Sequence, residues 1–319
     1  MPARAIRPIL PDVSSAFDIV IAGGGIAGLT AGLTSARLGR KTLVLTGDVL
    51  GGQLLSINRI DGYPGFPDGI AGYDLCPIAQ EQAASAGAEF AMTELMGLSA
   101  RNGGWRVATA AGDEHDAAAI IIATGTALKK LGVPGEERLF GKGVSHCASC
   151  DAPIMKGKVV AVVGGGDSAA QEALTLAEFA ERVIIFHRGD ALSAQAAYRD
   201  AVSAQKKIEL RCDTVVEEIL GDDHVTGVRV AGRGKTEIVD LAGVFAYIGM
   251  VPNTMFLAGA VALDDEGRIK TDPSLGTRSA GLYAAGSARS GWLGRAVASA
   301  GDGAAAAISA HRYVGVTHG

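Results

Sequence analysis

Aromatic side chains and positive charge are both scarce in this 319-residue chain. Phe, Trp and Tyr together make up 5% of the residues, and the formal net charge at pH 7 is −5. Proteins that hold single-stranded nucleic acid stack its bases on aromatic rings, and a nucleic acid backbone attracts clustered Lys and Arg. The composition therefore argues against nucleic acid as a partner.

Uninterrupted hydrophobic runs are also missing. The uncharged stretch 241–263 is broken by Val251-Pro252-Asn253-Thr254 and flanked by Asp240 and Asp264. A membrane-spanning helix needs about 20 consecutive apolar residues and favours Lys or Arg at its cytoplasmic end. We therefore expect a buried strand, a turn and a second apolar element over 241–263, and no membrane contact. Residues 1–15 contain three Pro and no apolar segment of signal-peptide length, which predicts a cytoplasmic protein.

Cysteine and proline are few, whereas glycine is abundant. The chain has 4 Cys, too few for a disulfide framework, and 10 Pro without a Gly-X-Y repeat, which excludes a collagen-like chain. Its 45 Gly amount to about 14% of the residues, against a usual level of about 7%. We expect these glycines in tight turns and at close backbone approaches. A hydrophobic content of 48% and this length are enough for two domains of ordinary size.

A strand–turn–helix–strand pattern opens the chain. The apolar run 17–22 leads into Gly23-Gly24-Gly25-Ile26-Ala27-Gly28, which is followed by a predicted helix ending at Leu38 and a strand over 41–45. In dinucleotide-binding units, glycines at this spacing let backbone N–H groups approach a pyrophosphate at the N-terminus of the helix.

The same pattern recurs in the middle of the chain. A strand over 158–163 leads into Gly164-Gly165-Gly166-Asp167-Ser168-Ala169, a helix over 171–180 and a strand over 182–186. A single glycine motif is a weak signal, but here each copy has a strand before it and a helix after it. Two such units predict two bound dinucleotides, most simply a flavin and a nicotinamide.

Two further segments have strand patterns. Residues 118–123 form an apolar run that ends in Thr124-Gly125. Near the C-terminus we expect a strand over 282–285, a turn at Gly286-Ser287 and an alanine-rich helix over 295–313.

Cys147 and Cys150 form a C-x-x-C pair followed directly by Asp151, shortly before the second glycine turn. Cysteines at this spacing can close a reducible disulfide, and the pairing tends to lower the pKa of one thiol. Structural zinc and an inert thiol pair are the alternatives, although Cys76 and Cys212 are isolated and offer zinc no second knuckle. Asp151 favours redox chemistry because a thiolate needs a nearby proton donor; its alternative role is a helix N-cap.

Taken together, these motifs resemble the low-molecular-weight bacterial thioredoxin reductases from Phe17 to Tyr313. The most specific one is the C-x-x-C-D just before the second glycine turn. The matching motifs are Gly23-Gly24-Gly25-Ile26-Ala27-Gly28, Thr46-Gly47, Gly51-Gly52-Gln53-Leu54, Tyr63-Pro64-Gly65, Ala123-Thr124-Gly125, Cys147-Ala148-Ser149-Cys150-Asp151, Gly164-Gly165-Gly166-Asp167-Ser168-Ala169 and Ala298-Ser299-Ala300-Gly301.

The resemblance implies an α/β fold with two Rossmann-like, three-layer nucleotide-binding domains, the second inserted in the first. A discontinuous FAD domain would comprise residues 17–126 and 252–319, and an NAD(P)H domain with the C-x-x-C would comprise 127–251. Residues 1–16 would form a flexible tail. It further implies a homodimer and electron flow from NAD(P)H through FAD to the Cys147–Cys150 disulfide, and on to thioredoxin or a similar small dithiol protein.

The resemblance also assigns the site residues. Cys150 would face the flavin, Cys147 would attack the protein substrate, and Asp151 would be the acid. The FAD site would contain Gly23, Gly25, Gly28, Thr46, Gly47, Gly52, Gln53, Thr124, Gly125, Gly286, Ser287, Arg295 and Ala296. The NAD(P)H site would contain Gly164, Gly166, Asp167, Ser168, His187 and Arg188.

Several positions depart from the resembling family. Its His-Arg-Arg-x-x-x-Arg cluster for the 2′-phosphate is reduced here to His187-Arg188-Gly189, with Ser193 in place of the last Arg. Its Gly-Asp near the C-terminus is Gly286-Ser287, and Leu293-Gly294-Arg295 replaces Tyr-Arg-Gln. We therefore expect altered FAD binding and weak binding of NADPH, with NADH as a possible coenzyme.

Three other functions compete with that of a disulfide reductase. The chain could be a dithiol oxidase that passes electrons to oxygen, a reductase fed by a protein donor, or a non-catalytic flavin-binding protein. The intact Gly164–Ala169 turn argues against the protein donor, because the turn would serve no nucleotide. The Cys147, Cys150 and Asp151 side chains argue against a non-catalytic role.

Overall fold

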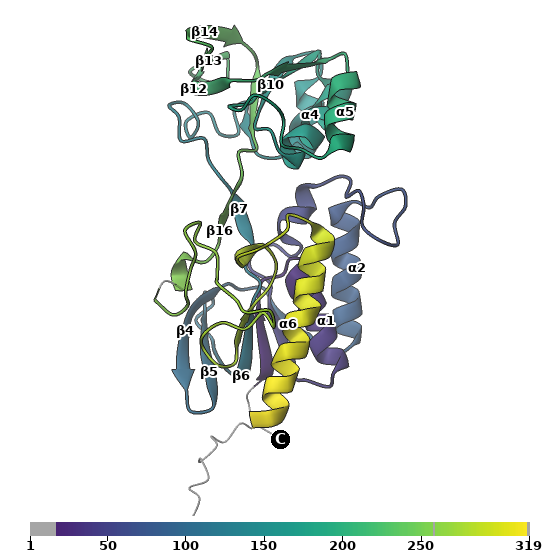
Figure 1. Ribbon diagram of the computed structural model, residues 1–319, viewed down its shortest axis with the longest axis vertical. Helices are drawn as coiled ribbons and strands as arrows, with labels where there is room; N and C mark the ends of the chain where they lie inside the picture. The colour runs from purple at the N-terminus through teal and green to yellow at the C-terminus, as the bar shows by residue number, and fades with distance from the viewer. Residues whose placement is uncertain (1–16, 258, 318–319) are drawn as a thin grey trace, which may run out of the picture. The chain divides into compact units, whose positions relative to one another are not determined.

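The computed structural model describes residues 17–257 and 259–317, so the predicted tail, residues 1–16, lies outside the described residues. The chain forms two compact units (Figure 1). Unit 1 comprises Met1–Ala127 and Pro252–Gly319, and unit 2, Leu128–Val251, is inserted between these two segments.

Unit 1 is built on a sheet whose central strand is β6. The strand order is β3-β2-β1-β6-β5-β4, and β17 pairs with the C-terminal end of β6. Strands β1, β2, β3, β6 and β17 are parallel, whereas β4 and β5 form an antiparallel hairpin beside β6. The strands are β1 Phe17–Ala22, β2 Thr42–Leu45, β3 Glu89–Ala91, β4 Leu95–Arg101, β5 Gly104–Thr109, β6 Glu114–Ile122 and β17 Leu282–Ala284.

Two hydrophobic layers cover the two faces of this sheet. On one face, Ile19 and Ile21 of β1 pack with buried residues of the helices α1 (Ile26–Arg37) and α6 (Ala296–Thr317), and α2 (Gly72–Ser85) lies beside α1 (Figure 1). On the other face, Val20 of β1 packs with Trp105 and other residues of the hairpin. This alternation is expected for a strand buried on both sides.

Unit 2 has a parallel sheet of order β11-β10-β9-β15-β8. Helix α4 (Asp167–Phe179) packs on one face, and the antiparallel sheet β12-β13-β14 contributes to the core on the other. Its remaining elements are β8 Val144–Ser145, α3 Ala148–Asp151, β9 Val159–Val163, β10 Arg182–Phe186, α5 Ala196–Ala204, β11 Ile208–Arg211, β12 Thr214–Leu220, β13 Gly227–Gly232, β14 Lys235–Asp240 and β15 Gly243–Ala246.

Three predicted boundaries differ by four residues from those of the structure. Helix α4 begins at Asp167, four residues before the predicted start at Gln171, because the chain turns into the helix directly after Gly166. Strand β6 begins at Glu114 rather than at residue 118, and α6 continues past residue 313 to Thr317.

The stretch 241–263 also differs in part from the prediction. It contains β15, as expected, but Val251 and Pro252 belong to a short strand, β16 (Met250–Pro252), which pairs with β7 (Thr126–Leu128). Proline is tolerated there because it ends an edge strand, where its missing N–H breaks no ladder. No helix within residues 17–257 and 259–317 is long and apolar enough to cross a membrane.

Close contact between α1 and α6 depends on one glycine of α6. A Cβ at Gly303 would lie 2.0 Å from the carbonyl oxygen of Ala27, whereas a Cβ at Gly301 would meet nothing within 4 Å. Gly303 and Gly301 therefore lie on the same helix, but only Gly303 is in close contact with α1.

We predict that Gly303→Ala lowers the free energy of unfolding of unit 1 by about 1–3 kcal/mol, since the helices must move apart. Gly301→Ala is the matched control and should raise it by up to about 1 kcal/mol, because Ala favours a helix over Gly. Urea unfolding followed by Trp fluorescence measures this, because Trp105 and Trp292 both lie in unit 1. Equal effects of the two substitutions would show that this contact does not limit the packing.

Candidate functional site

The first glycine turn packs so closely against neighbouring backbone that only glycine fits at two of its positions. Gly23 has φ +122°, and a Cβ there would lie 2.1 Å from the Ala123 carbonyl oxygen; a Cβ at Gly28 would lie 1.8 Å from that of Gly23. Gly25, by contrast, faces open space and precedes α1 without any side-chain cap. The N-terminus of α1 is therefore free to receive an anionic group such as a pyrophosphate.

A second loop packs against this turn. Gly51 donates its N–H to the Gly24 carbonyl (2.8 Å), and a Cβ at Gly52 would lie 3.6 Å from the Cα of Gly25. Gln53 is exposed in the 3-10 helix η1 (Gly52–Ser56) that follows. Two motifs more than twenty residues apart in the sequence thus form one edge of the site.

Thr46 and Gly47 directly follow β2. Thr46 is 4% exposed, and its hydroxyl lies 3.0 Å from the Gly47 carbonyl oxygen and 3.3 Å from that of Ala91. The hydroxyl proton is therefore already used within the protein. Thr46 can therefore offer a ribose only its acceptor lone pairs. The nearby acid Asp48 is exposed.

The ends of β6 and β17 meet at the same edge of the sheet. A Cβ at Gly125 would lie 3.8 Å from the Ser287 hydroxyl, which is 3.3 Å from the Thr126 hydroxyl. Thr124 donates to the Asn253 carbonyl (2.8 Å), and the Asn253 side-chain amide donates back to the Thr124 carbonyl (3.1 Å). These two loops are joined although 129 residues separate them.

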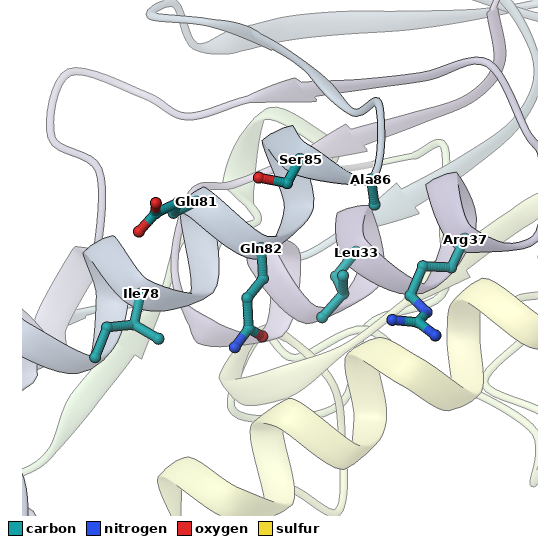
Figure 2. Close-up of a pocket in the computed structure, with 7 residues that line it drawn as sticks. All are labelled: Leu33, Arg37, Ile78, Glu81, Gln82, Ser85 and Ala86. Atoms are coloured by element: carbon teal, nitrogen blue, oxygen red, sulfur yellow. The ribbon is translucent and has the colours of Figure 1, made fainter.

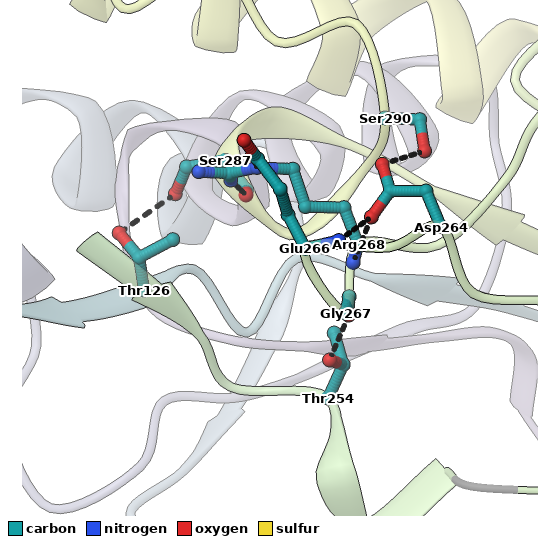
Figure 3. A network of polar contacts seen from close by, with 8 residues as sticks. All are labelled: Thr126, Thr254, Asp264, Glu266, Gly267, Arg268, Ser287 and Ser290. Carbon is teal, nitrogen blue, oxygen red and sulfur yellow. Dashed lines mark hydrogen bonds and ion pairs between the residues drawn. The ribbon is translucent and has the colours of Figure 1, made fainter. Parts of the chain in front are cut away.

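A nearly buried guanidinium lies behind Ser287 (Figure 3). Arg268 is 9% exposed, donates to the Ser287 carbonyl, and lies with its guanidinium 5.2 Å from the centre of the Trp292 ring. Its ion-pair partner Glu266, at 3.4 Å, has a side chain that is 78% exposed. Where the resembling family has a carboxylate, this chain therefore has a neutral hydroxyl with a cation behind it.

Asp264 fixes the loop that carries Arg268. It accepts the Arg268 N–H (2.8 Å) and the Ser290 hydroxyl (2.5 Å). Burial alone would raise the pKa of Asp264, but these hydrogen bonds hold it below its ordinary value. The carboxylate is thus bound within the loop.

Asp302 of α6 fastens the turn that contains Gly286. Its carboxylate accepts two hydrogen bonds from Arg289, at 2.7 and 2.9 Å, and one from the Gly286 N–H at 3.1 Å. Our sequence analysis missed this interaction, although a single acid between two glycines in an alanine-rich helix could have indicated it. Arg295, which was predicted, is exposed directly before Ala296, the first residue of α6.

The glycine turn of unit 2 has the same construction as that of unit 1. A Cβ at Gly164 would lie 2.2 Å from the Tyr247 carbonyl oxygen, whereas Gly166 faces open space and precedes α4. Asp167 accepts both the main-chain and the side-chain N–H groups of Gln195, at 2.7 and 2.8 Å. Ser168 is exposed in the first turn of α4.

Acidic and basic side chains mix at the end of β10. The His187 ring lies over the glycine turn, 2.3 Å from where a Cβ at Gly165 would be, and Arg188 is exposed. The pKa of Cys212 is raised, first by burial and then by Asp213 and Asp190, so these two acids lie close to this loop. The loop that carries Arg188 therefore also carries negative charge.

Cys147 and Cys150 are joined by a disulfide, with their Cα atoms 5.3 Å apart. Cys147 is half-buried and precedes the four-residue helix α3, whereas Cys150 is exposed. Asp151 is half-buried and occupies the N-cap position of the 3-10 helix η2 (Ala152–Met155), but its side chain makes no capping hydrogen bond there. The other two cysteines, Cys76 and Cys212, are free thiols.

A surface groove of unit 1 lies between α1 and α2 (Figure 2). It is lined by Leu33, Arg37, Ile78, Glu81, Gln82, Ser85 and Ala86. Leu33 and Arg37 lie in the C-terminal half of α1, whereas the glycine turn precedes its N-terminus. The groove is therefore separate from the predicted dinucleotide site.

Comparison with known proteins agrees with the resemblance. A family model described as pyridine nucleotide-disulphide oxidoreductase matches residues 17–303. The thioredoxin reductase of Listeria monocytogenes is 39% identical over 301 residues, covering 93% of this chain and 94% of its own.

Solved structures give the same result. The thioredoxin reductases of Lactococcus lactis and T. acidophilum superimpose with TM-scores of 0.91 and 0.89, each at 35% identity, and cover 94% and 93% of this chain and 99% and 98% of their own. The predicted resemblance, the fold class and the enzyme class are thereby confirmed. The chain belongs to the pyridine nucleotide-disulphide oxidoreductase family, among its thioredoxin reductases.

Proposed function

We propose that the chain passes electrons from NAD(P)H through FAD to the Cys147–Cys150 disulfide, and from there to thioredoxin or a similar small dithiol protein. The observation that carries this proposal is the disulfide itself. It lies at the start of α3, with Cys150 exposed, in a unit that has its own dinucleotide turn. We further propose, on the family resemblance, a homodimer in the cytoplasm.

The residues of unit 1 fit FAD. The uncapped N-terminus of α1 and the open space at Gly25 suit the pyrophosphate, and Gly51 and Gly52 close the turn from the side. Gly125, Gly286 and Ser287 lie together at the same carboxyl edge of the sheet, where ligands of such folds bind. When bound, FAD would accept a hydride and deliver two electrons to a disulfide.

The residues of unit 2 fit a nicotinamide dinucleotide. Gly164 and Gly166 form the turn, α4 offers its N-terminus, and His187 and Arg188 follow β10, where the adenosine ribose is read in such units. Asp190 and Asp213 near this loop disfavour a 2′-phosphate, whereas Arg188 favours it.

The two thiols would act in sequence once the disulfide is reduced. The Cys147 thiolate attacks one sulfur of the substrate disulfide, which forms a mixed disulfide and releases a substrate thiolate. Cys150 then attacks Cys147, which restores the Cys147–Cys150 bond and frees the second substrate thiolate. Asp151, half-buried beside Cys150, is the group placed to hold the proton that the thiols exchange.

We predict that the protein binds one FAD per chain and that Ser287→Asp slows its release. A hydrogen bond to a charged acceptor contributes about 1.5–3 kcal/mol against about 1 kcal/mol for a neutral one, so the release should slow about 2- to 30-fold. Flavin fluorescence after dilution measures this rate. Ser99→Asp, which adds the same charge at an exposed position of β4, is the control and should have no effect. Protein that cannot be reconstituted with FAD would contradict the proposal.

We predict that an anaerobic titration of the wild-type protein takes two electrons per chain more than that of Cys150→Ser, since the disulfide accepts two. The variant should lose disulfide reduction and keep any hydride transfer from coenzyme to flavin. Cys212→Ser removes a free thiol of the same unit and should behave as wild type. If Cys150→Ser still reduces a protein disulfide at the normal rate, the thiol assignment is wrong.

The coenzyme prediction concerns Gly189. The φ angle of Gly189 is not positive, so other residues can adopt the same backbone conformation. A Cβ at this position would lie 2.9 Å from His187 Nε2, so the imidazole ring must turn aside. Gly189→Arg should tighten NADPH about 10- to 150-fold through a charge-assisted contact with the 2′-phosphate, with little effect on NADH.

Coenzyme titration of flavin reduction measures both affinities, and the gain should shrink at high salt. Gly189→Gln is the control, because it has a similar length without the charge. Equal tightening of NADPH and NADH by Gly189→Arg would show that this loop does not bind the 2′-phosphate.

A further inference from the structure

Unpaired buried polar atoms gather around the redox helix α3. Among the described residues, four buried side-chain nitrogen or oxygen atoms have no hydrogen-bond partner. Ser35 is one of them. The other three are His146 Nε2 and Ser149 Oγ, which belong to the segment of the cysteines, and Glu172 Oε2 on α4, which packs against α3. Buried polar groups are rarely left unpaired in native proteins, and those that are deserve a chemical reason.

The two residues between the cysteines are held by ionisable groups from the interior. The Ala148 N–H donates to the Tyr247 hydroxyl at 3.0 Å. The backbone of Ser149 forms a hydrogen bond with the Glu172 carboxyl. Glu172 is 6% exposed and Tyr247 is 8% exposed. The carboxyl of Glu172 therefore lies directly beneath the backbone that joins the two sulfur-bearing residues.

Burial dominates the ionisation of Glu172. It raises the pKa of this carboxyl to about 7, against the lowering effect of the Ser149 N–H. Burial also raises the pKa of Tyr247, which Glu172 and Asp151 raise further, so the tyrosine stays protonated near neutral pH. Glu172 is thus the group of this pair that can change its charge.

Few other charges face Glu172. Helix α3 and its N-cap residue bring Cys150, Asp151 and Cys147, and Tyr247 directly follows β15. The 3-10 helix η2 (Ala152–Met155) and β9 bring no titratable side chain. The charged residues of α5, β10 and β11 are exposed or paired with one another: Arg199, Asp200, Arg182, Glu209 and Arg211. Helix α5 also brings the half-buried Tyr198, and Lys207, directly before β11, donates to the Ala177 and Ala180 carbonyls at the C-terminal end of α4.

We propose that Glu172 is a positioning residue that binds a proton when the Cys147–Cys150 disulfide is reduced. Two electrons break the S–S bond; one sulfur takes a proton from solvent and the other remains a thiolate. An ionised Glu172 beneath the same backbone would repel that thiolate, so the carboxylate takes a second proton from solvent. Oε2 can bind this proton because it accepts no other hydrogen bond. The proposal rests on the proposed redox function of the pair.

The sign of the effect follows from linkage. Below neutral pH, Glu172 is protonated in both redox states and changes nothing. Above neutral pH, the wild type must bind one extra proton on reduction. Each pH unit therefore lowers its equilibrium constant for reduction up to tenfold more than it lowers that of a variant whose residue 172 cannot ionise. For this two-electron couple, tenfold corresponds to about 30 mV.

The test compares the full-length protein with Glu172→Gln, which keeps the shape of the side chain and an acceptor for the Ser149 N–H. Both are equilibrated with dithiothreitol buffers between about pH 6 and about pH 9, and free thiols are counted after alkylation by mass spectrometry. We expect equal equilibrium constants at the acid end and an easier reduction of the variant at the alkaline end. Glu178→Gln, an exposed position of the same helix, should follow the wild type. Identical pH slopes for wild type and Glu172→Gln would overturn the proposal.

A second measurement needs only the wild type and applies even if Glu172→Gln does not fold. The infrared difference spectrum between reduced and oxidised protein near neutral pH should gain the C=O band of a protonated carboxylic acid, and its absence would overturn the proposal. Dithiothreitol supplies the electrons in both experiments. A failure of NAD(P)H to drive disulfide reduction would therefore contradict the proposed function alone, and leave these two results to decide on Glu172.

Discussion

The architecture of both units depends on one close contact between backbones. Gly23 lies against the carbonyl of Ala123, and Gly164 lies against that of Tyr247, so closely that a Cβ would come within 2.1 and 2.2 Å of the oxygen. In each unit the glycine directly follows a parallel strand, β1 or β9, and the carbonyl follows the neighbouring parallel strand, β6 or β15. This approach lets the chain turn sharply into α1 or α4 and leaves the N–H groups of the helix free at the carboxyl edge of the sheet.

Other parts of the unit 1 site are arranged around that edge. The loop at Gly51 packs on the glycine turn, and the ends of β6 and β17 bring Gly125 next to Ser287. The nearby charges differ from those of the resembling family. Asp302 does not replace the missing carboxylate at Ser287, because it is held by Arg289 and the Gly286 N–H, which take three of its about four acceptor sites. The edge therefore offers a flavin neutral hydroxyls, backbone N–H groups and the nearby cation of Arg268.

The sequence alone was sufficient for the parts of the fold that follow from local pattern. Strands β1 and β10 begin and end at the predicted residues, because a strand buried on both faces reads as a mostly apolar run. The antiparallel pair β4–β5 and the antiparallel sheet β12-β13-β14 were not predicted, since their outer faces are polar and their alternation is weak. Arg268 and Glu172 could not be recognised either. One is buried by a Trp ring far along the sequence, and the other lies beneath a helix from another part of the chain, so only the tertiary structure shows their chemistry.

The shortness of α3 explains why its surroundings matter to its chemistry. A helix of four residues has a single turn and cannot stabilise its own backbone, because nucleation is unfavourable and cooperative bonds are absent. Its conformation must come from contacts with the interior: Tyr247 holds the Ala148 N–H, Glu172 holds that of Ser149, and Ser145 holds that of Cys147. When the disulfide opens, the covalent constraint on this turn disappears while these hydrogen bonds remain. The geometry of the two thiols then depends on the three side chains, and the charge of the thiolate acts on the one among them that can ionise near neutral pH.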